Sequence, residues 1–215
     1  MKKDYIFFDF DGTLVDTGKG IFDSLNYAFE KMGEPILSEQ DMRKYIGPPL
    51  EWSFMNYNNM NEDEAAETSK HFRVNYKAKG VEMHSLYDGV EEMLCKLHEK
   101  GKILALATSK PEDFAVKILK DYDLYKYFDV ISGATFDGTR SSKSEVLNHA
   151  IELCKPNDLE KCVLVGDTEN DVIGAKQVGI DCVGVLYGFG SDEQLKNAGA
   201  VKTVATPQDV INLFD

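Results

Sequence analysis

Residues 5–14 read Tyr-Ile-Phe-Phe-Asp-Phe-Asp-Gly-Thr-Leu. The first four form a short, uninterrupted apolar run, which is typical of a strand buried on both faces of a parallel sheet, and the run stops at Asp9. Because side chains alternate along an extended backbone, Asp9 and Asp11 are expected to leave on the same side, and Gly12 permits the tight turn that follows. At about 5 Å and an effective dielectric near 20, two carboxylates repel by roughly 3 kcal/mol, so the pair needs a proton or a cation, and hard oxygen ligands favour Mg2+. An Asx-turn that closes the strand is the alternative interpretation.

The composition of the chain limits its class. Its 215 residues can bury a sizeable core, in one large domain or in a domain with a small insertion. A formal net charge of −13 argues against a protein that binds nucleic-acid polymers or anionic membranes. The four cysteines show no Cys-x-x-Cys spacing, which predicts reduced thiols, no zinc site and a cytoplasmic location. No apolar stretch is long enough for a signal segment or a bilayer span.

A helical block follows the opening strand. Gly18 to Lys31 carries apolar residues at the spacing of an amphipathic helix, and the pattern from Ser38 to Gly80 stays helical without strand alternation. A crossover between parallel strands normally uses one helix, so this longer block is better explained as an inserted cap. We therefore expect a helical cap domain at residues 17–83 and a core domain formed by residues 1–16 and 84–215.

Strand and helix signals alternate through the remainder of the chain. This order predicts an α/β fold with a Rossmann-like, doubly wound parallel sheet. The expected strands lie at residues 102–108, 129–132, 162–165, 182–185 and 201–204, and the expected helices at 89–100, 111–121, 142–154, 169–178, 191–197 and 208–214.

In open parallel sheets, ligands bind beyond the carboxyl ends of the strands. The apolar runs of this chain stop at Asp9, Thr108 and Asp167. The segment Thr108-Ser109-Lys110-Pro111 offers hydroxyls and helix-initiating amides, which suit a phosphate group. Helix capping is the alternative, since Ser109 precedes Glu112 by three residues and proline suits a first helical turn.

Two acids and a lysine add to this pattern. Asp167 and Asp171 lie one helical turn apart, so both carboxylates can line one approach to a cation, although Thr168 and Asp171 also fit a capping box. Lys143 falls in the first turn of an expected helix that follows Ser142. A cation there opposes the helix macrodipole by about 0.3 to 1 kcal/mol, and a nearby anion would remove that conflict. The alternative is an exposed lysine that points into water.

These segments together resemble a known family. Asp9-Phe10-Asp11-Gly12-Thr13-Leu14, Thr108–Pro111, Lys143 and Gly166–Asp171 resemble, in order, the four motifs of the haloacid dehalogenase superfamily. With a helical insert after the first motif, the chain is similar to the phosphoglycolate phosphatase group, which has a C1 cap on a Rossmann-like core. Residues 137–143, Asp-Gly-Thr-Arg-Ser-Ser-Lys, look closer to the 5′-nucleotidase-like branch. Residues 86–90 depart from the Pro-Tyr-Pro-Gly-Val type sequence of relatives, which concerns the cap hinge and not the chemistry.

The resemblance implies a Mg2+-dependent phosphoric monoester hydrolase that acts on a small phosphomonoester, either phosphoglycolate-like or a nucleoside 5′-monophosphate. It implies that Asp9 is the nucleophile that forms an aspartyl-phosphate and that Asp11 is the acid and base. Phosphate binding falls to Thr108, Ser109 and Lys143. Mg2+ would be held by Asp9, the backbone carbonyl of Asp11, Asp167 and Asp171. The candidates for substrate specificity are Arg43, Gly47, Glu51, Lys110 and Arg140.

Other functions remain compatible with the same residues. A sugar phosphomutase of the superfamily retains the acid at Asp11, and it would move phosphate within the substrate and not release it. A phospho-receiver module also uses clustered aspartates, a threonine and a lysine on a parallel sheet, but it would not need the helical insert. A phosphate-binding protein without activity is the remaining non-enzyme reading. The expected partner is a small-molecule substrate, with no nucleic-acid polymer and no membrane, for a monomer or homodimer.

Overall fold

The computed structural model describes residues 1–214, which fall into two compact units. The first unit, here called the sheet unit, contains residues 1–15 and the chain from residue 86 onward. The second, here called the helical unit, contains residues 16–85. The assignment of these units as catalytic core and cap stays a prediction.

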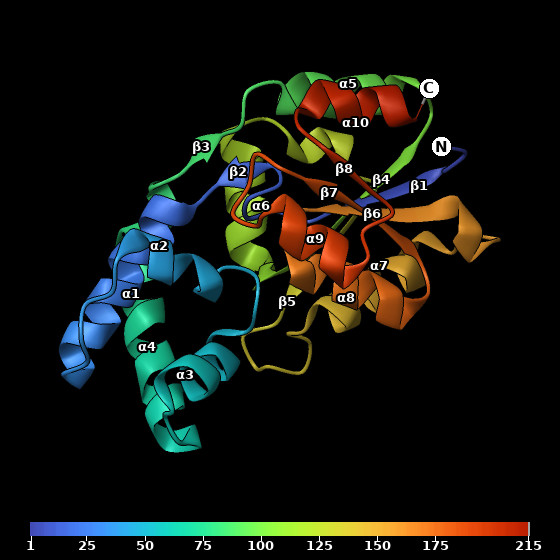
Figure 1. Cartoon of the computed structure of the whole chain (residues 1–215). Helices are drawn as coiled ribbons and strands as arrows, with labels where there is room; N and C mark the ends of the chain where they lie inside the picture. Colours follow the sequence, from blue (N-terminus) through green and yellow to red (C-terminus); the bar gives the residue numbers. More distant parts are fainter. Residues whose placement is uncertain (215) are drawn as a thin grey trace. The chain divides into compact units, whose positions relative to one another are not determined.

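The sheet unit is built on a six-stranded sheet with the order β5-β4-β1-β6-β7-β8 (Figure 1). Every neighbouring pair is parallel, and β1 pairs with β4 on one side and with β6 on the other. Its apolar residues Ile6, Phe7 and Phe8 are fully buried, as the opening run predicts. The predicted doubly wound parallel sheet is confirmed. The strands are β1 Tyr5–Phe8, β4 Ile103–Pro111, β5 Val130–Ala134, β6 Cys162–Gly166, β7 Asp181–Val185 and β8 Lys202–Val204.

Helices cover both faces of this sheet (Figure 1). One face carries α7 (Lys143–Cys154), α8 (Glu169–Val178) and α9 (Asp192–Ala198), and α5 (Val90–Glu99) lies beside α10 (Pro207–Leu213) on the other. The core under α7 to α9 combines sheet and helix side chains, among them Phe7, Leu164, Val146, Val172 and Leu195. Each fully buried side chain of this size contributes about 1.5–3 kcal/mol to stability. The shared core therefore holds α7, α8 and α9 against the sheet, and with them the helix starts against the strand ends. The sheet unit also contains α6 (Glu112–Asp121) and the 3-10 turns η3 (Tyr125–Tyr127) and η4 (Leu159–Lys161).

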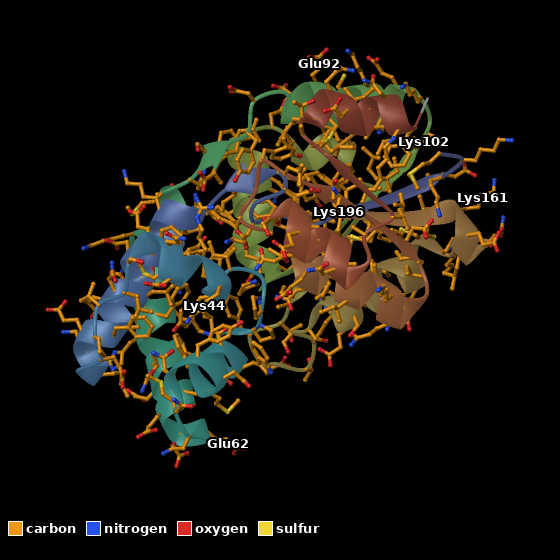
Figure 2. The ribbon with its side chains drawn as sticks, viewed as in Figure 1. Lys44, Glu62, Glu92, Lys102, Lys161 and Lys196 are labelled. Atoms are coloured by element: carbon orange, nitrogen blue, oxygen red, sulfur yellow. The ribbon has the colours of Figure 1, made fainter. Side chains whose placement is uncertain are left out.

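Charged side chains of the sheet unit project from its outer helices (Figure 2). Lys196 and Asp192 form an ion pair of 2.6 Å on α9, and Lys96 pairs with Glu92 at 2.5 Å on α5. All four side chains are exposed, and such pairs contribute only about 0–1 kcal/mol each, so the apolar core carries the stability. Among residues 1–214, no helix has both the length and the apolar character needed to cross a bilayer.

The helical unit has the helical character that its sequence predicts. Its helices are α1 Gly18–Met32, α2 Glu39–Met42, α3 Leu50–Asn58 and α4 Glu62–Ala78, with 3-10 turns η1 Arg43–Tyr45 and η2 Gly80–Glu82. The ring of Phe29 on α1 packs edge-on against Tyr45 and Phe54, with centroids 5.9 Å and 5.8 Å away. The short strands β2 (Val15–Asp16) and β3 (Ser85–Leu86) pair where the chain passes between the units. With two residues each, they are too short for a sequence pattern to reveal.

The structure corrects the end of one predicted strand. β4 runs to Pro111, not to Thr108, because β5 keeps pairing with it beyond an irregularity: Thr108 pairs with Gly133 and Pro111 with Ala134. Ser109 and Lys110 therefore bulge out of the ladder. The capping alternative for Ser109 is wrong, since Pro111 is the N-cap of α6 and no side chain caps that helix.

Candidate active site

Three buried carboxylates converge at the carboxyl ends of two neighbouring strands. Asp9 directly follows β1, Asp167 directly follows β6, and Asp171 lies in the first turn of α8. The backbone N–H of Asp9 donates to the carbonyl oxygen of Val165 at 2.9 Å, which holds the two strand ends level. One carboxylate oxygen from each aspartate lies within 4.8 Å of the others. The fold thus brings Asp9 together with Asp167 and Asp171, which lie more than 150 positions later in the chain, as their places at strand ends predict.

Asp171 has both roles that the sequence allows: it caps α8 and it belongs to the acidic cluster. Its Oδ2 accepts hydrogen bonds from the backbone N–H and the hydroxyl of Thr168, at 2.9 Å and 2.8 Å, and so caps α8. Its Oδ1 is buried and lies 2.9 Å from Nζ of Lys143. One oxygen therefore fixes the helix start while the other remains in the cluster.

Lys143 brings a buried cation to the three acids. It is the first residue of α7, which begins after Ser142 in a capping box with Glu145. Nζ lies 2.5 Å from Oδ1 of Asp9, and it donates to the carbonyl oxygen of Ala107 at 3.0 Å. Its side chain is only 5% exposed, so the alternative of a solvated lysine is wrong. The carboxylates supply the anion that the helix macrodipole argument requires.

Gly174 makes room for the stem of this lysine. A Cβ added at Gly174 on α8 would lie 2.4 Å from Cγ of Lys143, far inside ordinary contact distance. A glycine in a helix interior weakens the helix by about 1 kcal/mol relative to alanine. The absence of a side chain at this position is therefore what lets α7 and α8 approach with the lysine between them.

Burial dominates the electrostatics of the cluster. It raises the pKa of Asp9 to about 7, with the charge of Lys143 opposing this and that of Asp171 adding to it. Burial, together with the charges of Asp171 and Asp9, also raises the pKa of Asp167 well above its usual range. Burial opposes the charge of Lys143, but the carboxylates of Asp171 and Asp9 raise its pKa above the ordinary value. When all three acids are ionised, their charge exceeds that of Lys143, and the raised pKa values of Asp9 and Asp167 reflect this excess as well as burial.

Asp167 is held from two sides by groups of the sheet unit. The hydroxyl of Thr13 donates to its Oδ1 at 3.2 Å, and the backbone N–H of Phe189 donates to its Oδ2 at 2.7 Å. Gly12, with a φ of 85°, lies so close that an added Cβ would fall 2.1 Å from Oδ2. The turn after the opening strand therefore needs glycine both for its backbone angle and for contact with this carboxylate.

Asp11 lies outside the three-carboxylate cluster. Its Oδ1 accepts from Nζ of Lys110 at 2.9 Å, and the Lys110 and Asp11 side chains are 4% and 13% exposed. The bulge in β4 is what carries Lys110 toward Asp11, since the lysine would otherwise continue the ladder. Asp11 therefore has a lysine partner, Lys110, apart from the one that contacts the three-carboxylate cluster.

The irregular last part of β4 carries two hydroxyls. Thr108 is 1% exposed, and its Oγ1 accepts from the backbone N–H of Lys110 at 3.1 Å. The Oγ of Ser109 is buried and has no hydrogen-bond partner within residues 1–214. An unpartnered buried hydroxyl is unfavourable by about 1–3 kcal/mol, so this group is suited to donate to an incoming ligand.

The five specificity candidates do not come together in one unit. Lys110 and Arg140 lie in the sheet unit, where Arg140 pairs with Glu112 at 3.0 Å. The other three lie in the helical unit: Arg43 on η1, Gly47 in the loop after it, and Glu51 at the start of α3. Glu51 pairs there with Arg73 at 3.3 Å, and Arg43 is exposed. Their roles in specificity stay predictions.

Sequence patterns missed three groups of this site. Thr13 stands beside Gly12 in the opening motif, and that position is a usable signal for a contact to Asp167. Gly174 is a glycine inside a helical pattern, which signals a close approach in general but not its partner. Phe189 acts through its backbone N–H, which no residue pattern identifies.

The cluster fits a divalent metal ion. Asp9, Asp167 and Asp171 offer hard oxygen ligands in close reach, and when all three are ionised their charge exceeds that of Lys143. A bound cation would favour the ionised carboxylates and so offset both the burial and the mutual repulsion that raise the pKa values of Asp9 and Asp167.

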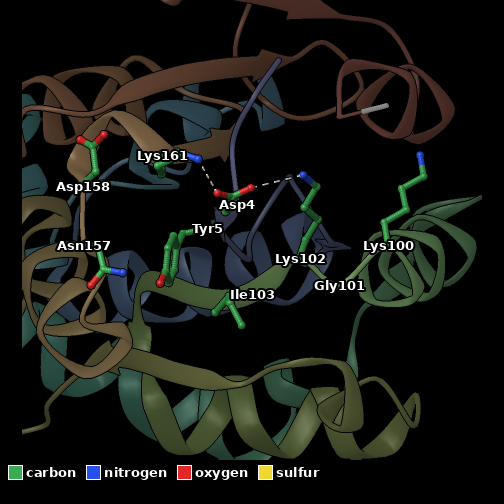
Figure 3. Close-up of a pocket in the computed structure, with 9 residues that line it drawn as sticks. All are labelled: Asp4, Tyr5, Lys100, Gly101, Lys102, Ile103, Asn157, Asp158 and Lys161. Carbon is green, nitrogen blue, oxygen red and sulfur yellow. Dashed lines mark hydrogen bonds and ion pairs between the residues drawn. The ribbon is translucent and has the colours of Figure 1, made fainter.

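A separate cleft of about 260 Å3 lies at the opposite edge of the sheet (Figure 3). Its lining includes Asp4, Tyr5, Lys102, Ile103 and Lys161, at the amino ends of β1, β4 and β6. Asp4 pairs with Lys161 at 2.9 Å and with Lys102 at 3.8 Å. Its central carboxylate is thus already neutralised by lysines, and none of the three buried aspartates reaches it.

Comparison with known proteins gives consistent results. The model of a family described as haloacid dehalogenase-like hydrolase matches residues 6–185. A 5′-nucleotidase of Pseudomonas aeruginosa is 37% identical over 193 residues, with 89% of this chain and 86% of that protein covered. A phosphoglycolate phosphatase of Vibrio parahaemolyticus is 32% identical, with 88% and 86% covered. The tyrosine-protein kinase PtkA of Mycobacterium tuberculosis is 41% identical, but this chain spans only 62% of it.

A solved structure shows the same fold. The crystal structure of a protein described as a predicted phosphatase from Clostridium acetobutylicum is 38% identical and superimposes with a TM-score of 0.95. The similarity covers 99% of this chain and 98% of the other. The fold of this chain therefore has an experimental counterpart.

Proposed function

This chain belongs to the haloacid dehalogenase-like hydrolases, and we propose that within them it is a Mg2+-dependent phosphatase that cleaves a small phosphomonoester through an aspartyl-phosphate. The family predicted from the four sequence motifs is confirmed. The observation that carries the proposal is the buried set of Asp9, Asp167, Asp171 and Lys143 at the carboxyl ends of β1 and β6. Such a set can hold a metal ion and a phosphate dianion at one point.

Asp9 is the nucleophile in this mechanism. It ends a rigid, buried strand, so its carboxylate can be held in line with the phosphorus atom. Attack by its oxygen forms the aspartyl-phosphate while the bond from phosphorus to the substrate oxygen breaks, and Asp11 gives a proton to the departing alcohol. Asp11 then takes a proton from water, which attacks the phosphorus and frees the phosphate. Asp9 is regenerated in the process.

The remaining residues stabilise the transferring group. Thr108 and Ser109 would donate hydrogen bonds to phosphoryl oxygens, and Lys143 would neutralise part of their charge. Mg2+ held by Asp9, Asp167, Asp171 and the backbone carbonyl of Asp11 would supply further charge neutralisation. The helical unit would act as a cap that excludes water during the reaction.

We place nucleoside 5′-monophosphates ahead of phosphoglycolate as substrates. Two observations support this order: the likeness of residues 137–143 to the nucleotidase-like branch, and the relative named 5′-nucleotidase, which is 37% identical. The relatives named phosphoglycolate phosphatase are 30–32% identical.

A phosphate-release panel tests the proposal. Purified protein with Mg2+ is given nucleoside 5′-monophosphates, phosphoglycolate and sugar phosphates, and free phosphate is measured against a chelator control. We expect metal-dependent release that is fastest with a nucleoside monophosphate. Rearranged sugar phosphate without release would indicate a phosphomutase, and stable phosphorylation or binding without turnover would indicate a receiver or phosphate-binding module. Transfer from a nucleotide to protein tyrosine would point to the kinase relative.

A further inference from the structure

Arg140 fastens three elements of the sheet unit to one another. Its Nε donates to the carbonyl oxygen of Gly133 at 2.8 Å, and its Nη2 lies 3.0 Å from Oε2 of Glu112. The same Oε2 accepts from the backbone N–H of Gly133 at 3.0 Å. One guanidinium and one carboxylate thus close a ring with the backbone N–H and carbonyl of Gly133, next to the last residue of β5. We call this arrangement the Arg140–Glu112 brace.

The brace sits between the two segments that carry the phosphate-binding side chains. Glu112 is the first residue of α6 and directly follows Pro111, the last residue of the strand β4 that carries Thr108 and Ser109. Lys143 is the first residue of α7, three positions after Arg140. Pro111 is the last ladder residue before α6, and α7 begins outside the ladder, so side-chain contacts between the two segments contribute to the separation of the two helix starts.

Packing around the brace leaves little freedom. A Cβ added at Gly133 would lie 2.5 Å from Cα of Glu112, so β5 and the start of α6 are in direct contact. The backbone of Arg140 is fixed as well, since its carbonyl accepts from the N–H of Thr135 at 2.8 Å and its N–H donates to the hydroxyl of Thr135 at 3.1 Å. The Arg140 side chain is 19% exposed. The backbone of Arg140 is therefore held in place as well as its guanidinium group.

We propose that Arg140 and Glu112 are positioning residues that hold the Thr108–Lys110 segment and Lys143 at the separation that the transferring phosphoryl group requires. This inference rests on the phosphatase function proposed above. From the sequence, Arg140 is a candidate for substrate specificity, a role that a direct contact to the substrate would provide. Because Nε and Nη2 are already engaged by Gly133 and Glu112, a structural coupling accounts better for the side chain.

Kinetics distinguish the two roles. Arg140→Gln, Arg140→Lys, Glu112→Ala and the Arg140→Gln/Glu112→Ala double variant are compared with wild type, with Lys161→Gln as the matched control. Lys161 forms an ion pair of similar length, 2.9 Å with Asp4, at the opposite edge of the sheet (Figure 3). The readouts are kcat and KM for two nucleoside monophosphates and p-nitrophenyl phosphate, together with inhibition by inorganic phosphate, which has no leaving group.

A brace predicts one common loss. We expect Arg140→Gln and Glu112→Ala each to lower kcat/KM by roughly 10- to 100-fold for every substrate, since a misplacement of about 1 Å can cost about 100-fold. Inhibition by inorganic phosphate should weaken as well. The double variant should be no worse than the poorer single variant, because both break the same connection. Arg140→Lys should lose less, since a lysine can still pair with Glu112. Lys161→Gln should match wild type.

Two results would overturn the proposal. A change in relative rates between substrates with unchanged phosphate inhibition would make Arg140 a substrate contact. Losses that multiply in the double variant would show that the two residues act separately.

Hydrogen exchange provides a readout that needs no activity. In Arg140→Gln, amide exchange should rise both in residues 107–114 and in residues 141–147, because both helix starts lose a common anchor. Faster exchange confined to residues 135–141 would refute the coupling. If wild-type protein released no phosphate at all, the proposed function would fall, while exchange would still decide whether the brace couples the two segments.

Discussion

Replacing Gly174 by alanine should favour helix formation in α8 but displace the side chain of Lys143. Alanine is favoured over glycine in a helix interior by about 1 kcal/mol, so propensity alone predicts a more stable α8. The added Cβ would lie 2.4 Å from Cγ of Lys143, however, and ordinary carbon–carbon contacts are near 3.5 Å. The stem of the lysine must therefore retreat by about 1 Å.

A shift of that size separates the ammonium group from its partners. Nζ of Lys143 lies 2.5 Å from Asp9 and 2.9 Å from Asp171, and an additional 1 Å or so takes both beyond good hydrogen-bond range. Since a misplacement of about 1 Å can cost about 100-fold in rate, we expect kcat/KM to fall by about 100-fold, or about 2.7 kcal/mol. Overpacking at roughly 1–3 kcal/mol offsets the helix gain, so the free energy of unfolding should change by less than about 2 kcal/mol.

Phosphate release and urea unfolding measure the two effects on one preparation. Ile173→Ala is the matched control, because Ile173 precedes Gly174 in the same helix and is 44% exposed. The control should keep kcat/KM within about twofold, as exposed substitutions usually change energies by no more than about 0.5 kcal/mol. A Gly174→Ala variant that kept wild-type kcat/KM would refute the argument that this glycine positions the lysine.

Three further predictions concern the aspartates and the helical unit. Chelation should abolish phosphate release, and Asp167→Asn should raise the Mg2+ concentration needed for it, whereas full turnover in excess chelator would contradict a metal site. Asp9→Asn should be folded but inactive. With p-nitrophenyl phosphate, Asp11→Asn should accumulate one phosphoryl group on the peptide containing Asp9, measured by rapid quench and mass analysis. A phosphoryl group on Asp167 would contradict the assignment of Asp9 as nucleophile. Substituting Arg43 and Glu51 should alter relative rates across the substrate panel, and identical ratios would remove both as specificity residues.

Much of the sheet was predictable because its chemistry is local. An apolar run such as Tyr5–Phe8 that stops at an acid indicates both a buried strand and the residue at which it ends. The start of a helix such as α8 can likewise be recognised from its capping residues. The carboxyl-end rule then grouped Asp9, Thr108 and Asp167 without any coordinates. For Asp9 and Asp167 the structure confirms the grouping, because β1 and β6 are neighbouring parallel strands that end at the same edge, whereas β4 continues past Thr108 to Pro111.

The remainder depends on neighbours that are distant in the chain. The extension of β4 to Pro111 follows from pairing with β5, so the sequence of β4 alone could not reveal it. The backbone donor of Phe189 and the partner of Gly174 are likewise products of packing. Glu112 stands at capping-box spacing from Ser109, but β4 continues through Ser109 to Pro111, so Glu112 accepts instead from Arg140 and from the backbone N–H of Gly133.

The central place of β1 has a consequence for how the chain folds during synthesis. β1 is the first strand of the sheet to be made, yet its two partners begin only at Ile103 and Cys162. At roughly 5–20 residues per second, the ribosome needs about 5–20 s to reach the first of them. Throughout that interval, the strand Tyr5–Phe8 has two unpaired edges and three large apolar side chains without their final cover. The nascent chain therefore carries this apolar segment without its cover throughout that interval, and residues 16–85, which form a compact unit of their own, are complete before the first partner strand is made.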